Sequence, residues 1–365
     1  MNKYKHLFIK LCKKIKINKL MYKLTSFFVN DNKIEKDYIS ARKDLCEYHP
    51  YRDVSVIGNN KIHKLEYDLQ IIVPVYNVEQ YVEKCIDSIL NQKTNYKYCV
   101  YIIDDGSTDN SSSIINKYKE IDNVRIINQE NGGLSSARNT GLKDIYAKYL
   151  MFVDSDDYIT SNCVETMLEC AYENDADIVE ASCISIKGDN HIDYIKETKR
   201  IDEKDLSGFA WGKVYKSNLF EKLLFPISYL YEDTMLYFMV FPKAKNIYSI
   251  SDALYMHIVN NSGIVMSSIG NKKSIDTYWV TELLNKERKT LEYTNDNNYM
   301  YKLKNQFIMN YSRTCLLPLN IQKDMFVLEQ NIFKNEFDIK QFNDVFLGYI
   351  YNGQFDKYSH YAKWN

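Results

Sequence analysis

Short apolar runs that end in polar residues alternate with amphipathic segments from residue 66 onward. This alternation restricts the possible folds more than any other feature of the chain. Four such runs are "LQIIVPVYN" (69–77), "YCVYIIDDG" (98–106), "VRIINQENGG" (124–133) and "YLMFVDSDD" (149–157). Their β-branched, nearly continuous apolar character predicts buried strands. Strands of this kind, separated by helices, predict an α/β fold with a mostly parallel sheet covered on both faces.

The segments between the runs have helical periodicity. Asn77 is expected to cap the first helix, with Gln80 three residues later as its capping-box partner. Further helices are expected over residues 110–119 and 134–146. One apolar stripe on the first helix is formed by Val78, Val82, Cys85 and Ile89.

Unusual polar residues gather where the predicted strands end. In parallel sheets, ligands bind beyond the carboxyl ends of the strands, so one crevice is expected to collect these side chains. A single Asp-x-Asp is a weak signal, because turns favour Asp for its hydrogen bonds to the backbone. The combined set is a stronger one. Its members are Tyr76, Asp104, Asp105, Asn131, Asp154 and Asp156.

Composition and cysteine spacing limit the functional classes. The 365 residues are 45% hydrophobic and 26% charged, which predicts a globular protein with one sizeable core and appendages. The net charge of -1 gives no argument for nucleic acid as a partner. The eight cysteines show no CxxC or metal-ligand spacing. Reduced thiols in a cytoplasmic protein are therefore expected.

The first 24 residues contain eight lysines and no acidic residue. A basic amphipathic helix is predicted, which would lie peripherally on the anionic inner face of the cell membrane. The alternative is a solvated helix that packs on the body of the protein. No apolar run approaches the ~20 residues that cross a bilayer, and no secretory signal pattern is present. The apolar positions of this helix are Leu7, Phe8, Leu11, Ile15 and Leu20.

Beyond residue 270 the pattern becomes purely helical. Ile275, Trp279 and Leu283 are spaced four apart in the first of these segments. The expected organisation is a basic amphipathic extension over 1–65, a catalytic domain over 66–268 and a helical C-terminal region over 269–365.

Taken together, the runs "IIVPVYN", "IIDDGSTDNS", "NQENGGLSSARNTGL", "YLMFVDSDD" and the later "YEDT" resemble the family 2 glycosyltransferases with the GT-A fold. The order and spacing are similar over about residues 69–265. The resemblance implies an inverting glycosyltransferase of the bacterial capsule or exopolysaccharide type. It would move a sugar from a nucleotide-sugar donor to a glycan or a lipid-linked saccharide.

The resemblance also implies roles for residues that hold the donor. Asp105 would accept the N3–H of a uracil, which favours a UDP-sugar. Arg138 suits the diphosphate because its planar fork binds phosphate oxygens in pairs, and the alternative for it is a charge on a helix surface. The nucleotide-sugar set implied is Pro74, Tyr76, Asp104, Asp105, Asn131, Arg138, Asp154 and Ser262.

A divalent cation is implied beside the diphosphate. Asp156 would bind Mn²⁺ or Mg²⁺, and Asp154 would face the ribose or a metal-bound water. His257 would be a third metal ligand or a phosphate donor, and Ser262 a hydroxyl donor to phosphate. A structural role is the alternative for His257. Asp157 is expected to be a turn or helix-capping residue.

The acceptor side is implied by two later segments. In "YEDT", Asp233 would be the base that takes the proton from the acceptor hydroxyl, with Glu232 as support. The alternative is that Asp233 caps the helix that begins near Thr234. Trp211, in "FAWGKVYK", would stack on an acceptor sugar, and the alternative is a buried core tryptophan.

Two other functions compete with the glycosyltransferase. A sugar nucleotidyltransferase would need a Gly-rich, basic loop after the first strand, and "PVYNVEQYVEK" has none. A non-catalytic nucleotide-sugar-binding scaffold would be indicated by loss of Asp156 or Asp233, and both are present.

Overall fold

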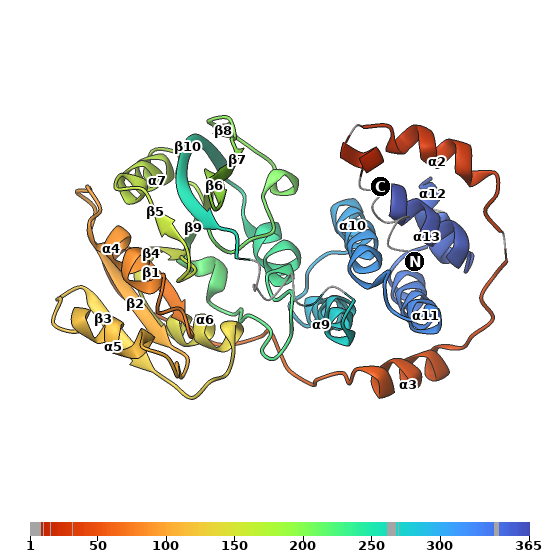
Figure 1. Cartoon of the computed structure of the whole chain (residues 1–365), viewed down its shortest axis with the longest axis horizontal. Coiled ribbons are helices and arrows are strands. Elements are labelled where there is room, and N and C mark those ends of the chain that lie inside the picture. Colours follow the sequence, from red (N-terminus) through yellow and green to blue (C-terminus); the bar gives the residue numbers. More distant parts are fainter. Residues whose placement is uncertain are drawn as a thin grey trace. The chain divides into compact units, whose positions relative to one another are not determined.

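The computed structural model describes residues 9, 11–14, 16–30, 32–260, 268, 270–338 and 343–365. The chain divides into two compact units. One unit, Val54–Gly263, is built on a β-sheet, and the other joins Met1–Asp53 to Ile264–Asn365 and is helical. We call them the α/β unit and the helical unit, and each is described by itself (Figure 1).

The α/β unit follows the predicted alternation of strands and helices. Its strands are β1 (Lys61–Val75), β2 (Tyr98–Asp104), β3 (Val124–Asn128), β4 (Asp144–Phe152), β5 (Tyr158–Ile159), β6 (Ile178–Lys187), β7 (Asn190–Tyr194), β8 (Lys199–Arg200), β9 (Lys213–Lys216) and β10 (Ile247–Ile258). Its α-helices are α4 (Val82–Leu90), α5 (Ser111–Ile115), α6 (Leu134–Leu142) and α7 (Cys163–Glu173). Short turns of helix are η1 (Asn116–Tyr118), η2 (Glu203–Asp205), η3 (Ser217–Phe220), η4 (Leu236–Val240, π-helical) and η5 (Phe241–Lys243).

The strands form one sheet in the order β3-β2-β1-β4-β9-β6-β10-β5, with β7 beside β6 and β8 beside β10. The first four strands of this order are parallel, as predicted. The strand β9 then runs antiparallel to both β4 and β6, so the sheet is mixed. Because β1, β2 and β4 are parallel, their carboxyl ends lie at one edge, where the polar residues follow.

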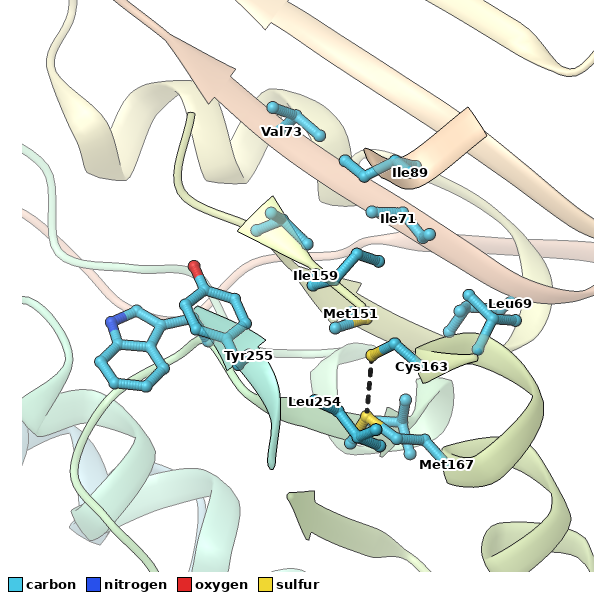
Figure 2. Close-up of a cluster of buried hydrophobic side chains, with 14 of the residues drawn as sticks. Leu69, Ile71, Val73, Ile89, Met151, Ile159, Cys163, Met167, Leu254 and Tyr255 are labelled. Atoms are coloured by element: carbon cyan, nitrogen blue, oxygen red, sulfur yellow. Dashed lines mark hydrogen bonds between the residues drawn. The ribbon is translucent and has the colours of Figure 1, made fainter. Parts of the chain in front are cut away.

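The alternation of side chains along β1 explains why its sequence is apolar throughout. Leu69, Ile71 and Val73 belong to the core that includes α4 and α7, shown in Figure 2. On the opposite face, the Gln70 side-chain amide donates to the carbonyl of Gly141 in α6 at 2.9 Å. Helices therefore cover both faces, which removes the polar face that an exposed sheet would keep.

Two predictions about local structure are wrong. Asn77 does not cap a helix: α4 begins at Val82, and Asn77 adopts φ 51°, with its side-chain oxygen accepting from the N–H of Thr108 at 2.8 Å. The helix expected over 134–146 ends at Leu142, because the chain turns directly into β4. The predicted apolar stripe of the first helix is confirmed, since Val82, Cys85 and Ile89 are fully buried and Val78 packs against them.

The helical unit contains segments from both ends of the chain. Its elements are α2 (Asn18–Ser26), α3 (Tyr38–Tyr48), η6 (Lys272–Ile275), α9 (Asp276–Thr290), α10 (Asn297–Thr314), α11 (Leu319–Glu336), α12 (Val345–Tyr351) and α13 (Phe355–Trp364). The stripe of Ile275, Trp279 and Leu283 is fully buried. The indole N–H of Trp279 donates to the carbonyl of His49 at 3.0 Å, which ties α9 to the end of α3.

This joining differs from the predicted organisation, which separated an N-terminal extension from a C-terminal helical region. The strand β1 also begins at Lys61, inside the extension expected over 1–65. Within the described residues, no helix is both long enough and apolar enough to span a membrane. The eight cysteines are free thiols.

Candidate active site

The end of β1 exposes a tyrosine beside a rigid turn. The polar edge begins with Tyr76, whose side chain is 47% exposed directly after Pro74 and Val75. The next residue, Asn77, binds the loop that follows β2 twice: its side-chain oxygen accepts from the N–H of Thr108, and its own N–H donates to the hydroxyl of Ser107. The aromatic ring of Tyr76 is therefore presented on a fixed backbone at the carboxyl end of the sheet.

The two aspartates that follow β2 are buried and hydrogen-bonded to the protein. Asp104 accepts from the N–H of Ser107 at 3.0 Å and from the hydroxyl of Ser112. Asp105 is 2% exposed and accepts from the N–H groups of Gly132 and Gly133, both at 2.8 Å. In this structure the carboxylate of Asp105 thus holds the start of α6, which favours an anion at that helix end.

Asn131 completes this junction between the β2 and β3 ends. Its side-chain amide donates to the carbonyl of Asp105 at 3.0 Å. Gly106 has φ +74°, and a Cβ there would lie 3.0 Å from the backbone nitrogen of Asn131. Only glycine allows such a close approach of the two loops. Asp105 and Asn131 are brought together as predicted, within one hydrogen-bonded loop pair.

Arg138 is the centre of the site. It lies on α6, is 1% exposed, and donates to Glu232 at 3.0 Å, Asp233 at 2.9 Å and Asp154 at 2.9 Å. Burial opposes its charge, but the carboxylates of Asp233, Asp154 and Glu232 raise its pKa above the usual value, so it stays cationic. The alternative of an exposed helix charge is wrong.

Glu232 and Asp233 lie on the turn that leads into the helical segment from Thr234. Burial and the neighbouring Asp233 raise the pKa of Glu232 to about 7, and burial raises the pKa of Asp233 as well. The second oxygen of Asp233 accepts from the N–H of Ala210 at 3.3 Å. These contacts aim the Asp233 side chain at Arg138 and Ala210 and away from its own helix, which argues against the cap alternative.

The turn after β4 carries the Asp-x-Asp pair. Asp154 is linked to Arg138, and its N–H donates to the hydroxyl of Tyr255 at 3.1 Å. Burial and the charge of Asp154 raise the pKa of Asp156 to about 6. Two acidic side chains so close together favour a cation between or beside them.

Asp157 has the structural role that was expected of it, although it does not cap a helix. Its carboxylate accepts from the Tyr255 hydroxyl and from the N–H of Ile258, both at 2.7 Å. Burial raises its pKa to about 8, and Asp154 and Asp156 add to that rise. Asp157 therefore ties the turn after β4 to β10.

The described residues contain no group of three or more His, Cys, Asp or Glu side chains arranged to hold a metal ion. The fit to Mn²⁺ or Mg²⁺ rests instead on the acidic pair Asp154 and Asp156. Hard cations of this kind are commonly bound by one or two carboxylates, with substrate phosphates and water as the other ligands.

His257 lies on β10, next to Ile258, whose N–H binds Asp157 of the acidic turn. Its Nδ1 pairs with the hydroxyl of Ser185 at 3.0 Å, which leaves Nε2 as the ring nitrogen for another partner. Burial lowers its pKa, so the ring is neutral at pH 7. Ser262, the predicted phosphate donor, lies outside the described residues.

Trp211 is not placed as an exposed stacking surface. It is 8% exposed, and the rings of Phe209 and Tyr255 lie nearly parallel to it with centroids 4.6 Å away. His257 stacks on it as well, at 5.1 Å. The alternative of a core tryptophan therefore describes its packing better, and the exposed ring of this stack is Phe209.

Sequence reasoning missed four residues at this candidate site. Tyr255 organises the acidic turn, Lys213 pairs with Glu180 and donates to the carbonyl of Phe209, and Phe209 itself is exposed. The available signal was a lysine and a glutamate inside otherwise apolar strands, since buried charges are rare unless paired.

Comparison with known proteins gives a family match for the α/β unit. Residues 70–239 match the model of the family described as glycosyl transferase family 2. The glycosyltransferase GlyA of Streptococcus pneumoniae serotype 4 is 37% identical over 218 residues, covering 54% of this chain and 31% of GlyA. The uncharacterized glycosyltransferase EpsJ of Bacillus subtilis is 32% identical over 229 residues, covering 58% of this chain and 66% of EpsJ. A substantial part of each relative thus lies outside the match.

Solved structures of S. aureus TarS share the fold. The crystal structure of TarS 1–349 has a TM-score of 0.60 at 21% identity, covering 80% of this chain and 89% of that chain. A second crystal structure holds TarS 1–349 in complex with UDP-GlcNAc and has a TM-score of 0.53. At this level of identity the likeness concerns the fold alone.

Proposed function

Residues 70–239 belong to glycosyl transferase family 2, with the GT-A fold, and from this premise we propose that the protein is an inverting glycosyltransferase. It moves a sugar from a UDP-sugar to a hydroxyl of a glycan or lipid-linked saccharide during surface polysaccharide synthesis. The observation that carries the proposal is the buried guanidinium of Arg138, which joins Asp154 to the pair Glu232 and Asp233. One cation thereby links a donor-side carboxylate to two acceptor-side carboxylates.

Asp233 is the proposed base. An inverting transfer needs one carboxylate that takes the proton from the acceptor hydroxyl while that oxygen attacks the anomeric carbon opposite UDP. A raised pKa suits this work, because a more basic carboxylate accepts a proton more readily. Glu232 shares Arg138 with it and holds the geometry. An α-linked UDP donor would give a β-linked product.

Arg138 itself is assigned a positioning role. The family resemblance would place it on the diphosphate, whereas its contacts here are three carboxylates and the face of Phe225, 5.2 Å from the ring centroid. Without this cation, the carboxylates of Asp154, Glu232 and Asp233 would repel one another in a buried setting. A direct phosphate contact would require it to exchange one of these partners.

Asp154 and Asp156 are the proposed holders of Mn²⁺ or Mg²⁺, with Nε2 of His257 as a further ligand or a phosphate donor. When bound, the metal supplies Lewis-acid neutralisation of the charge that develops on departing UDP. The chain's own contribution is to keep the acidic turn in place. It does so through Tyr255, whose hydroxyl accepts from the N–H of Asp154 and donates to Asp157.

The uridine is assigned to the edge of the sheet at the exposed Tyr76, with Pro74, which is buried in β1, as the other predicted contact. Asp105 supports this site by holding the loop of Gly132 and Gly133. Because both of its carboxylate oxygens already accept from that loop, a base N–H would have to bind to a lone pair that these bonds leave free. Asp104 and Asn131 stabilise the same loops. The TarS complex with UDP-GlcNAc supports a UDP-sugar as the donor for this fold.

Peripheral membrane contact on the cytoplasmic side is proposed for α2. Met21 and Tyr22 pack on the helical unit, and two hydrogen bonds hold the helix there: Asn18 donates to the carbonyl of Trp364 at 2.9 Å, and Thr25 pairs with His360 at 3.1 Å. Leu24 of α2 is 55% exposed and, together with Phe27 and Phe28 just beyond the helix end (86% and 90% exposed), forms an apolar face. Lysines accompany this apolar face, and the described segment 16–30 contains no acidic residue. An apolar, basic surface of this kind fits an anionic lipid surface.

The deciding experiment is calorimetric titration of the purified protein with UDP, GDP and CDP, each with Mn²⁺ and again with chelator. We expect metal-dependent binding of UDP alone, and loss of that binding in Asp156→Ala. Asp157→Asn is not a suitable control because Asp157 supports the turn, so Asp122→Ala, at an exposed position in the turn before β3, serves instead. Folded protein that binds no nucleotide would favour the non-catalytic scaffold. Binding of a nucleoside triphosphate in preference to UDP would favour the nucleotidyltransferase.

A further inference from the structure

Phe209 is an exposed aromatic side chain that stacks on a buried aromatic ring. Its side chain is 50% exposed, and its ring lies 4.6 Å from Trp211 at an interplanar angle of 10°. Trp211 in turn stacks on Tyr255, whose hydroxyl organises the acidic turn. The stack therefore runs from the turn after β4 to solvent, and Phe209 is its outer ring.

The backbone that carries Phe209 is held by a buried ion pair. Lys213 is fully buried, and its ammonium donates to the carbonyl of Phe209 at 2.8 Å and to the hydroxyl of Ser207 at 2.7 Å. It also lies 3.0 Å from the carboxylate of Glu180, which is 2% exposed. Glu180 additionally accepts from the N–H of Ser207 at 3.0 Å. These contacts fix the 207–209 loop, because moving the loop away would leave the buried ammonium of Lys213 without hydrogen-bond partners, which is strongly destabilising.

The same loop touches the proposed base. The N–H of Ala210, the residue after Phe209, donates to the carboxylate of Asp233 at 3.3 Å. The carbonyl of Ala210 accepts from the hydroxyl of Tyr215 at 3.0 Å. One short segment therefore presents an aromatic face to solvent and a backbone donor to Asp233.

On the basis of the proposed function, we propose that Phe209 is an acceptor subsite, on which the apolar face of one acceptor pyranose ring stacks. Lys213 and Glu180 are its positioning residues. The C–H face of a pyranose is apolar while its rim is hydroxylated, so an aromatic ring binds the face and leaves a hydroxyl directed at the base. This assigns to Phe209 the contact that sequence reasoning gave to Trp211.

The test measures UDP release by the full chain with Mn²⁺, UDP-GlcNAc, UDP-glucose or UDP-galactose as donor, and the methyl β-glycosides of glucose, galactose and N-acetylglucosamine as acceptor probes. Phe209→Ala is expected to raise the KM for the stimulating glycoside by about 5- to 10-fold, the equivalent of one aromatic contact. UDP affinity and acceptor-independent UDP release stay unchanged. Phe209→Trp is expected to restore the KM.

Tyr194→Ala, which removes a side chain that is 53% exposed on β7, is the matched control and leaves every parameter unchanged. An unchanged KM in Phe209→Ala, or wild-type protein that binds UDP but responds to none of the glycosides, overturns the subsite and leaves the donor site standing. Wild-type protein that binds no UDP overturns the proposed function itself.

Discussion

At the scale of single residues, the site depends on how one buried cation is shared. Arg138 pairs with carboxylates that lie 16, 94 and 95 positions away along the chain. Its Nε has no hydrogen-bond partner among the described residues, although the atom is buried. A buried, unsatisfied donor costs about 1 to 3 kcal/mol, so the arrangement is retained at a stability cost. Retention at such a cost is typical of functional sites.

The pH dependence of turnover tests the carboxylate pair. Burial raises the pKa of both Glu232 and Asp233, the former to about 7, and the proposed base must be deprotonated to act. Turnover is therefore expected to fall as the pH decreases through about 7. This acidic limb of the pH profile reports the titration of Glu232 and Asp233 together, because the two carboxylates interact. Glu232→Gln removes a neighbouring negative charge, so the limb should move to lower pH.

The matching variant Asp233→Asn is expected to lower turnover by about 100-fold or more at every pH, because it removes the base. The measurement is the pH profile of UDP release at saturating donor. An Asp233→Asn protein with wild-type turnover would contradict the assignment of Asp233.

At the scale of elements, buried charge holds β6 against β9. Burial raises the pKa of Glu180, but the ammonium groups of Lys213 and Lys196 outweigh it, so the pKa is held below its usual value. Lys213→Met leaves Glu180 with Lys196 as its remaining cation, and is expected to cost about 3 to 5 kcal/mol in the free energy of unfolding. Urea denaturation measures this loss.

Lys216→Met on the same strand is the matched control. Lys216 pairs with Asp175 and Asp177 and its side chain is 23% exposed, so about 1 kcal/mol or less is expected. The double variant Lys213→Met, Glu180→Gln should recover part of the loss, because it also removes the buried carboxylate that the single variant leaves with one cation in place of two. Equal losses for Lys213→Met and Lys216→Met would show that burial of the pair has no special importance.

The packing of α10, α11 and α13 includes a buried acid with a shifted pKa. Glu329 accepts from Asn310 at 2.9 Å and from the hydroxyl of Tyr358 at 2.8 Å, and burial raises its pKa from 4.5 to about 8. Between these values the unfolded chain loses the proton first. The free energy of unfolding therefore falls as the pH rises from about 4.5 to about 8 and levels off above that range.

Glu329→Gln removes this titration while keeping the shape. Its amide can donate to Tyr358, whose hydroxyl also contacts the carbonyl of Phe307 at 3.2 Å. From pH 5 to pH 8 the wild-type free energy of unfolding is expected to fall by about 2 to 4 kcal/mol more than that of the variant. Denaturant titrations at both pH values measure the difference, and parallel pH dependence of the two proteins would refute it.

At the scale of the whole molecule, one unit is proposed to carry the chemistry and the other a surface that binds lipid. The double variant Leu24→Asp, Phe28→Asp is expected to lower binding to vesicles of phosphatidylglycerol and phosphatidylcholine by about 10-fold or more, since it removes two exposed apolar side chains and adds negative charge. Vesicle flotation measures the bound fraction, and UDP affinity stays unchanged.

The control for this prediction is Ile39→Asp, Leu319→Asp, which changes two apolar side chains of the same unit that are 78% and 57% exposed. Binding should remain near the wild-type value in the control and should weaken with salt in the wild type, because the attraction is partly electrostatic. Equal vesicle binding by all three proteins would exclude α2 as the membrane surface.

The local sequence pattern was sufficient to predict the architecture of the α/β unit. The apolar runs became β1, β2, β3 and β4, their polar ends lie at one edge of the sheet, and the family motifs agree with the family match over residues 70–239. These features depend on the spacing of apolar residues over short segments, which can be read directly from the sequence. Errors occurred where a side chain had a distant partner: Asn77 binds the loop after β2 and does not cap its own helix.

What the sequence by itself determined, then, is the order of the elements, the covered sheet and the set of residues at its carboxyl edge. Only the tertiary structure decided that Arg138 joins Asp154 to Asp233, that Asp105 is turned onto the glycine loop, and that Phe209 is the exposed ring while Trp211 is covered. The physical reason is that burial and charge pairing depend on which distant segments meet, and a one-dimensional pattern records the residue type at each position but not its neighbours in space.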